Sequence, residues 1–482
     1  MATIDALPSK GLSTDTWDRA NERLVADLQD LIRLPTVNPP GDEIVAARYL
    51  EAALDEIGIP SIVIEPVLGR GSIVARLHGD GSGGGPLLLL SHLDVVPAPA
   101  EHWTHDPFGA EIADGYVYGR GAVDMKSMVA MELGVLRLLA EQARAAGRDP
   151  GTDPIPGLRR DVLFAATADE EAGGRAGAIW IAEHHPEWLQ ADGALNEAGG
   201  VSAELAGHRF YPIQVAEKGF LIYRFLVHGT AGHASMPRDD NAAVRAARIV
   251  DRLADPGPGR VTPVMARFFE ALRATAPELD RPIASIVKAV EEGDPGRQRA
   301  ALAAACDPMY GRTLSALLRD TISPDVIHAG YKYNVIPGEA TVEIDIRQLP
   351  GSTEPEIRTM LRGRIGEELW SAMDVELVVT GEPTESPTDS ELYRVLETTL
   401  RDHDPDGIPV PIMAPFATDA KSTMLRLGVP TYGFSPLRLD PAERFLERFH
   451  GVDERVSVEA LRFGLPVLYD AVRRFCDERL AS

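Results

Sequence analysis

The chain has 482 residues, enough for two domains with a large buried core, and carries 73 acidic against 48 basic side chains, a formal net charge of −25 at pH 7. Such an acidic surface disfavours nucleic acid and anionic membranes as partners, because both carry negative charge. Only Cys306 and Cys476 occur, too few for a disulfide framework, and the sequence shows neither a basic-then-apolar leader nor an apolar run of membrane-spanning length, so we expect a cytoplasmic protein.

The first predicted elements are two helices and three strands. Apolar residues recur on one face over residues 14–33, and a second helical pattern covers residues 43–57 and ends at a glycine. Two short strands are expected at residues 61–65 and 72–77. After a glycine-rich turn, the run from Leu87 to Leu90 is apolar at every position. A strand buried on both faces has this pattern, so we predict a parallel strand inside an α/β sheet.

His92 and Asp94 follow this strand and are two residues apart. Residues at i and i+2 of a strand point to the same side, so both side chains can project from its carboxyl end. A carboxylate beside a histidine fixes its tautomer and raises its basicity, which suits a metal ligand. The simpler interpretation, a histidine satisfied within the surface or core, is favoured when this pair is considered alone.

Asp124 follows a turn rich in glycine, and a helical pattern then runs from Met125 to about Glu141. An aspartate at this position is most often an N-cap, so by itself it carries little functional weight. The stretch from Gln142 to Arg160 is rich in glycine, proline and charge and is predicted to be a surface loop.

Two further apolar strands end in carboxylates. The strand over residues 162–167 precedes Glu170 and Glu171, and an apolar segment at residues 194–195 precedes Glu197. Acidic pairs near helix starts commonly only match the helix dipole. However, the carboxyl ends of parallel strands form one crevice, so all these groups are expected to converge. One histidine with several carboxylates suits zinc, and a shared aspartate would suit two metals.

A second nitrogen donor is available in His450, which precedes a short amphipathic helix predicted from Val458; alone, His450 could equally be a surface turn residue. The pattern changes near Glu217. The elements expected beyond that point are a strand at 220–227, a helix at 241–253, a largely helical insertion of unassigned function at 260–323, a strand at 340–346, a helix at 389–401 and a strand at 431–434.

Seven motifs give the chain a resemblance to a known family. They are SHLDVVP, GRGAVDMK, ATADEEAGG, NEAGG, AGHASMP, YNVIPGEATVEIDIR and FHGVDERV, and they occur in the family's order over nearly the whole chain. The chain resembles the co-catalytic zinc metallopeptidases that include aminoacylase, glutamate carboxypeptidase and succinyl-diaminopimelate desuccinylase. Its C-terminal part is most similar to the carboxypeptidase S and N-fatty-acyl amino acid hydrolase branch.

The resemblance implies an α/β fold with two domains. The catalytic domain, with a mixed sheet flanked by helices, would comprise residues 1–216 and 383–482. An inserted α+β lid would comprise residues 217–382 and would form a homodimer.

The resemblance also assigns the metal site. Two zinc ions per chain, replaceable by Co²⁺ or Mn²⁺, would be bound. His92, Asp124 and Glu197 would hold one ion, and Asp124, Glu171 and His450 the other. Asp94 would orient His92, and Glu170 would be the general base. The Asp124–Met125 peptide bond is expected to be cis.

Three lid residues are implied to bind substrate. His233 would stabilise the oxyanion in the partner subunit's active site, while Asn334 and Arg347 would grip a carboxylate or carbonyl group of the substrate. Without the resemblance, His233 would be read as a turn residue and Arg347 as a solvated strand residue. The chain departs from the branch at residues 416–421. Phe416 and Lys421 stand there in the turn that usually contains glycine and arginine, so the resemblance does not define the pocket for the substrate carboxylate.

Three functions are compatible with these residues. The first is hydrolysis of the amide bond of an N-acyl amino acid or of the C-terminal bond of a short peptide. The second is an aminopeptidase-like dipeptidase, against which Glu197 argues because such relatives tend to have aspartate there. The third is a non-catalytic binding protein, which is disfavoured because every catalytic position holds the residue that the chemistry needs.

Overall fold

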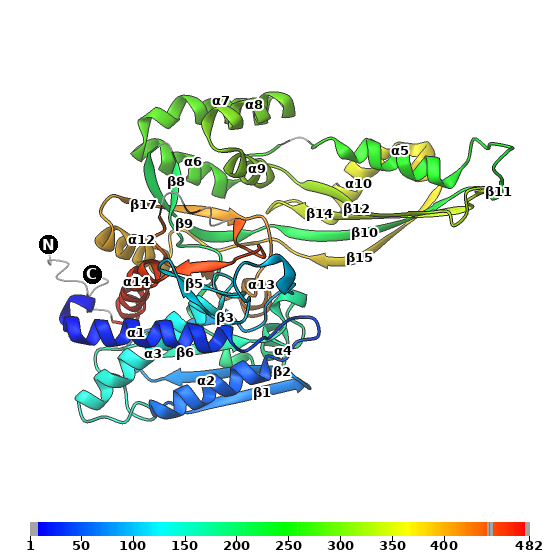
Figure 1. The fold of residues 1–482 in the computed structure, drawn as a ribbon. Coiled ribbons are helices and arrows are strands. Elements are labelled where there is room, and N and C mark those ends of the chain that lie inside the picture. Colours follow the sequence, from blue (N-terminus) through cyan, green and yellow to red (C-terminus); the bar gives the residue numbers. More distant parts are fainter. Residues whose placement is uncertain (1–7, 206, 258, 441–442, 444–446, 478–482) are drawn as a thin grey trace. The chain divides into compact units, whose positions relative to one another are not determined.

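The computed structural model describes residues 8–205, 207–257, 259–440, 443 and 447–477. Two compact units make up the chain (Figure 1). Unit 1 comprises Met1–Val215, Ser386–Pro411 and Thr418–Ser482, and unit 2 comprises Ala216–Glu385 and Ile412–Ala417. The stretch before Pro8, where no leader was predicted, lies outside the described residues. No helix in the described part of the chain is long and apolar enough to cross a membrane.

Ten strands form one mixed sheet, in the order β1, β2, β6, β3, β7, β18, β9, β16, with β8 and β17 also paired to β9. Their bounds are β1 (Ser61–Val67), β2 (Arg70–Leu77), β3 (Leu87–His92), β6 (Val162–Thr167), β7 (Gly193–Asn196), β8 (Ala203–Leu205), β9 (His208–Glu217), β16 (Thr384–Glu385), β17 (Gly407–Ala414) and β18 (Thr431–Gly433).

The four-leucine strand β3 lies in the middle of this sheet. It pairs in parallel with β6 on one side and β7 on the other, in a register that sets Leu87 opposite Val162 and Gly193. Leu87 to Leu90 are all fully buried. The prediction of a parallel strand buried on both faces is confirmed, and the carboxyl ends of the three strands meet at one edge.

Seven helices belong to the described part of unit 1: α1 (Thr14–Ile32), α2 (Ile44–Glu56), α3 (Lys126–Ala145), α4 (Ala178–His184), α12 (Glu391–His403), α13 (Ala420–Leu427) and α14 (Val458–Cys476). Two of them differ from expectation. α3 continues four residues past Glu141, into the predicted loop. α14 has 19 residues and was wrongly predicted to be short. Most positions along α14 are buried, so packing sustains the helix even through Pro466.

A three-stranded sheet joins the C-terminal segment to the loop that precedes α3. Its strands are β4 (Ile112–Ala113), β5 (Tyr116–Tyr118) and β19 (Arg455–Ser457), in the order β19, β5, β4. The β19–β5 pairing sets Arg455 opposite Tyr118. Residues 451–454 are therefore held beside residues 119–124, although more than 300 positions separate them in the sequence.

Unit 2 contains a separate antiparallel sheet in the order β12, β14, β10, β15. Burial alternates along its central strands, and one face packs on helices α5 and α10 through a core that includes Phe225, Ile249, Val342 and Leu361. The alternating strand predicted at 340–346 is thus present. The elements are β10 (Gly219–His228), α5 (Ala242–Ala254), β12 (Thr321–Ala329), β14 (Glu339–Gln348), α10 (Glu354–Ile365), α11 (Glu367–Trp370) and β15 (Met373–Gly381).

The insertion is helical, as the sequence indicates, and consists of α6 (Pro263–Thr275), α7 (Asp280–Glu291), α8 (Pro295–Ala305) and α9 (Pro308–Leu317). Lys218 holds the C-terminal end of this helical insertion. The Nζ atom of this buried lysine donates to Ala316 O, one of the last carbonyls of α9, at 3.0 Å and to Arg319 O, just beyond the helix, at 2.9 Å. Unit 2 also contains a separate two-stranded sheet, β11 (Gly232–His233) with β13 (Val335–Ile336).

Candidate metal centre

Five segments of unit 1 deliver the predicted metal ligands to one place. His92 ends β3, Glu170 and Glu171 lie in a 3-10 turn directly after β6, and Glu197 directly follows β7. Because these strands are parallel neighbours, their side chains meet beyond the same edge of the sheet. Asp124 comes from the loop between β5 and α3, and His450 precedes β19.

The carboxylate of Asp124 lies between the two imidazoles. Its Oδ1 is 3.1 Å from His92 Nε2, and its Oδ2 is 3.2 Å from His450 Nε2. Glu197 Oε2 is 3.6 Å from His92 Nε2, and Glu171 Oε1 is 3.2 Å from His450 Nε2. Two groups of potential metal ligands result, His92–Asp124–Glu197 and Asp124–Glu171–His450, and they share Asp124.

These side chains are better suited to binding a pair of cations than to satisfying one another by hydrogen bonds. His92 Nε2 faces two carboxylates, and so does His450 Nε2, yet each ring nitrogen carries at most one proton. Imidazole nitrogen with carboxylate oxygen is the ligand set of zinc and similar divalent metals. The interpretation of Asp124 as a helix N-cap is wrong, because α3 is capped by Met125 without a side-chain hydrogen bond. The Asp124–Met125 peptide bond is cis, as the resemblance implied.

The electrostatics of the site reflect its crowded carboxylates. Burial raises the pKa of Glu197 to about 8, with a further increase from the nearby Asp124. Hydrogen bonds to Asp124 and Glu171 raise the pKa of His450 to about 10. Burial opposes the charged form of His92, but the surrounding carboxylates outweigh it and raise its pKa well above the ordinary value. Protons thus neutralise part of the charge that divalent cations would neutralise.

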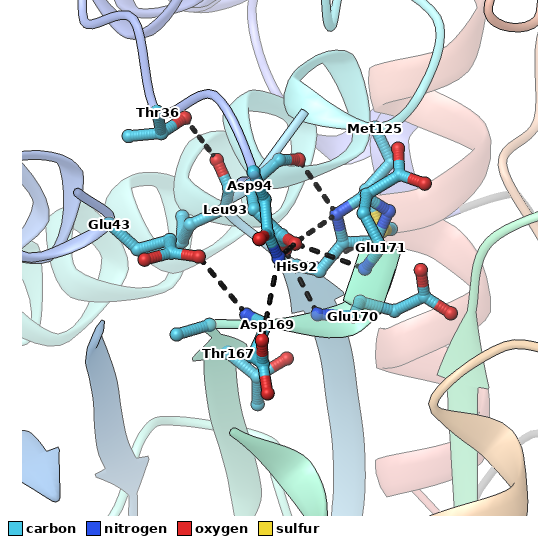
Figure 2. A network of polar contacts seen from close by, with 12 residues as sticks. Thr36, Glu43, His92, Leu93, Asp94, Met125, Thr167, Asp169, Glu170 and Glu171 are labelled. Atoms are coloured by element: carbon cyan, nitrogen blue, oxygen red, sulfur yellow. Dashed lines mark hydrogen bonds and ion pairs between the residues drawn. The ribbon is translucent and has the colours of Figure 1, made fainter. Parts of the chain in front are cut away.

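Asp94 lies beside His92 and has further contacts that the sequence did not predict. His92 Nδ1 lies 3.0 Å from the backbone carbonyl oxygen of Asp94 and 3.5 Å from its carboxylate, so the main chain sets the tautomer that leaves Nε2 for a metal. The Asp94 carboxylate also accepts from the backbone N–H groups of Glu170 (3.1 Å) and Glu171 (3.0 Å) and from Asn38 Nδ2 (2.8 Å). Figure 2 shows Asp94 between His92 and the turn that bears Glu170 and Glu171. One residue thus couples the His92 ligand to the turn that bears Glu170.

Glu170 is close to the ligands but belongs to neither group of potential ligands. Its backbone nitrogen faces Asp94, while its carboxylate extends away from that network (Figure 2). Burial raises its pKa well above the ordinary value, and the Glu197 carboxylate adds to the shift. A carboxylate held beside a metal pair without serving as a ligand is suited to proton transfer.

Comparison with known proteins identifies the family. The profile of peptidase family M20/M25/M40 matches residues 88–474. The chain belongs to this family. It is 29% identical over 476 residues to the N-fatty-acyl-amino acid synthase/hydrolase PM20D1 of Xenopus tropicalis, covering 94% of this chain and 86% of that protein. It is 28% identical over 386 residues to the probable carboxypeptidase S-like 2 of Dictyostelium discoideum, covering 78% of this chain and 68% of that protein.

The fold agrees with this assignment. The M20 metallo-carboxypeptidase Sso-CP2 of Sulfolobus solfataricus superposes with a TM-score of 0.66 at 16% identity, covering 94% of this chain and 99% of that one. The resemblance to the carboxypeptidase S and N-fatty-acyl amino acid hydrolase branch is confirmed. The chain is therefore a metal-dependent hydrolase of the M20 type.

A second set of polar residues, not predicted from the sequence, supports the turn that precedes Glu170 in the M20 site. Glu43 is fully buried, and its Oε1 accepts from Arg70 Nη1 at 2.6 Å and from Asp169 N at 3.2 Å. Arg70 also donates to Asn38 Oδ1 at 2.8 Å. Asp169 has a left-handed backbone (φ 71°), which turns the chain toward Glu170. The segment Asn38-Pro39-Pro40-Gly41 could have drawn attention to these residues in the sequence, because clustered prolines and glycine indicate a defined turn.

The departure from the M20 branch at residues 416–421 also has a defined structure. Asp419 is buried, and its Oδ2 accepts from Thr167 Oγ1 at 2.6 Å, while Thr418 Oγ1 accepts from Asn196 Nδ2 at 3.0 Å. Burial raises the pKa of Asp419 to about 7. This segment thus fastens the ends of β6 and β7, and Phe416 is partly exposed in unit 2.

Glu132 on α3 gives a prediction on pH and stability. It is fully buried, accepts from Ser91 Oγ at 2.7 Å, and burial raises its pKa to about 8. From pH 4.5 to 8 the folded chain keeps this proton while the unfolded chain releases it, so the free energy of unfolding falls as pH rises. Glu132→Gln should remove up to about 5 kcal/mol of this decline. Urea unfolding of both chelator-treated proteins at pH 5 and 8 measures it; parallel pH dependences would contradict the prediction.

In unit 2, strand pairing brings His233 and Asn334 together. His233 lies opposite Val335, and Ala234 N donates to Asn334 O at 3.1 Å. His233 is exposed, and Ser235 N donates to its Nδ1 at 3.2 Å. Since Nδ1 accepts this hydrogen bond, the neutral ring carries its proton on Nε2, which can donate outward.

Arg347 is not near this pair within unit 2. It sits opposite Phe220 at one end of the β10–β14 ladder, whereas Glu339, at the other end, lies opposite His228 and near β11. Eight residues of strand separate the two ends, about 26 Å. The Arg347 guanidinium forms a two-pronged pair with Asp345 at 2.8 and 2.9 Å, so a substrate carboxylate would compete with Asp345.

Proposed function

We propose that this protein is a two-zinc hydrolase that cleaves the amide bond of an N-acyl amino acid or the C-terminal peptide bond of a short peptide. The observation that carries the proposal is the pair of ligand groups joined by Asp124. A single carboxylate with one oxygen toward each imidazole is the arrangement expected for a bridging ligand. Metal-dependent hydrolysis is the chemistry of the family to which the chain belongs.

In this proposal His92, Asp124 and Glu197 hold one ion, and Asp124, Glu171 and His450 hold the other. Such ions would supply a bound water of lowered pKa and a polarised substrate carbonyl. Glu170 accepts the proton of the attacking water and returns it to the leaving amine, since its carboxylate lies beside the ligands without being one of them. Zinc is proposed from the ligand types, with Co²⁺ or Mn²⁺ as functional substitutes.

The residues proposed to bind the substrate belong to unit 2. His233 is proposed to donate its Nε2 proton to the developing oxyanion, and Asn334 to bind a carbonyl beside it. The separation of Arg347 from this pair along β14 supports a site in a homodimer, in which Arg347 comes from one chain and His233 and Asn334 from the other. Arg347 would then bind the free carboxylate of the substrate, which favours an acylated amino acid or a peptide C-terminus.

A dipeptidase remains the second candidate, and a substrate panel separates the two. We expect reconstituted protein to contain two zinc ions per chain by elemental analysis and to hydrolyse N-acyl amino acids faster than free dipeptides. A chelator should remove this turnover, and zinc should restore it, because the nucleophile depends on the metals.

Each result of the panel has a definite meaning. Faster cleavage of free dipeptides would establish the second candidate and overturn the N-acyl assignment. A protein that contains only traces of transition metal after reconstitution would overturn the two-zinc centre.

A further inference from the structure

Glu454 is a fully buried carboxylate that is not among the metal ligands. It lies directly before β19, whose pairing with β5 holds the C-terminal segment beside the loop that carries Asp124. It comes four residues after His450. A buried carboxylate requires several donors, so its partners indicate what it does.

Four donors converge on the Glu454 carboxylate. Oε1 accepts from Val123 N at 2.7 Å and from Asp124 N at 3.1 Å. Oε2 accepts from Gly121 N at 3.1 Å and from Arg120 Nη1 at 2.6 Å. With two donors on each oxygen, the carboxylate has its full complement of partners as an anion. It therefore holds three backbone N–H groups of the loop, those of Gly121, Val123 and the shared Asp124.

Arg120 extends this contact to the second ligand. Its guanidinium is almost fully buried, donates to the backbone oxygen of His450 at 3.2 Å, and lies 5.2 Å from the centre of the Trp103 ring. One ion pair thus contacts the main chain of both Asp124 and His450. These two residues lie 326 positions apart in the sequence, and no local element fixes their spacing.

The other half of the centre is supported differently. His92 and Glu197 follow the parallel neighbours β3 and β7, and the main chain of Asp94 sets the His92 ring. No hydrogen bond from Glu454 or Arg120 reaches either side chain among those found in the described residues.

We propose that Glu454 and Arg120 are a positioning pair that sets the metal affinity of the Asp124–Glu171–His450 half of the centre. The inference rests on the proposed two-metal function and adds residues to it. Groups that orient metal ligands typically change metal affinity about 10–100-fold when they are removed. The loss should fall mainly on the ion held by His450, because the pair contacts that ligand and Asp124 but not His92 or Glu197.

Glu454→Gln tests the proposal, because it keeps the shape but turns an amide NH₂ toward a set of N–H donors. The readout is zinc content by elemental analysis during titration with a chelator. Wild type is expected to keep both ions at a chelator concentration at which Glu454→Gln keeps one. Glu443→Gln is the matched control: Glu443 lies seven residues before His450 and accepts from Arg448 at 3.0 Å and from Arg455 at 3.4 Å, neither of which belongs to the Asp124 loop. The control should keep both ions.

The outcomes separate the inference from the function on which it rests. Wild type with two ions and Glu454→Gln with the same two, equally resistant to chelator, would overturn the positioning role alone. Simultaneous loss of both ions from a variant with wild-type circular dichroism would overturn its restriction to the His450 half. A wild-type chain with fewer than two ions would overturn the proposed centre.

Arg120→Lys serves as a second variant in case Glu454→Gln folds poorly. The shorter reach and missing fork of lysine should weaken the hydrogen bond to His450 O while retaining a positive charge. We expect a smaller shift of chelator resistance in the same direction. No shift in a folded Arg120→Lys protein would remove Arg120 from the pair.

Discussion

Glu170→Gln is expected to lower kcat by about 10²–10⁴-fold while leaving the zinc content near that of the wild type. Glutamine keeps the size of the side chain and the backbone N–H that donates to Asp94. It cannot accept the proton of the attacking water. Since Glu170 lies outside both ligand groups, the metals should remain bound. Turnover of the preferred substrate and elemental analysis of the same sample measure the two effects.

Glu183→Gln is a suitable control for this experiment. Glu183 is a carboxylate on α4 that pairs with Arg426 at 3.1 Å on the surface. The same chemical change there should leave kcat within about twofold, as for surface substitutions in general. A near wild-type kcat for Glu170→Gln would reject the assignment of the general base, and loss of zinc would move Glu170 into the ligand set.

His233→Ala is expected to lower kcat by about 10²–10³-fold, equivalent to about 3 kcal/mol for one oxyanion donor. The imidazole presents an Nε2 proton outward, because Nδ1 accepts from Ser235 N. Alanine leaves the developing charge without this donor. His228→Ala is the control, since His228 is also partly exposed in unit 2 and pairs with Asp374 at 2.9 Å. Only the His233 variant should lose turnover.

A mixing experiment decides in which chain His233 acts. If it serves the active site of a second copy, inactive His233→Ala mixed with inactive Glu170→Gln should regain activity. In a mixed dimer, one site combines an intact Glu170 with the His233 of the other chain. No recovery in a mixture shown to exchange subunits would mean that His233 acts in its own chain or not at all.

The hydrophobic pattern along the chain predicts the sheet edge at which the ligands meet. Leu87 to Leu90 and residues 162–167 are apolar at nearly every position, which only strands buried on both faces sustain, and their carboxyl ends must then lie side by side. His92, Glu171 and Glu197 directly follow such strands, so local pattern and chain order were enough to place them together. The motifs likewise led to the family that the comparisons confirm.

The contacts that hold those ligands in place are visible only in the folded chain. Asp94 was expected to orient His92. The structure adds that its backbone carbonyl oxygen lies 3.0 Å from the ring nitrogen and that its carboxylate also holds the Glu170 turn. A strand pattern cannot show this, because periodicity gives the direction of a side chain and not its partner. The same limit explains α14, whose length depends on packing around most of its circumference rather than on its own amphipathic pattern.

The contact of Glu454 with the Asp124 loop is the strongest example. Its donors lie 330 to 334 positions away in the sequence, and the motif FHGVDERV that contains Glu454 does not show which groups its carboxylate contacts. Arg347, at one end of β14, likewise stands apart from His233 on β11 only because β10 and β14 are ten residues long and fully paired. Local propensity and hydrophobic period act over a few residues, so they fixed the elements and their ends. Contacts between distant segments depend on burial and hydrogen bonding in the folded chain, and the structure alone reveals them.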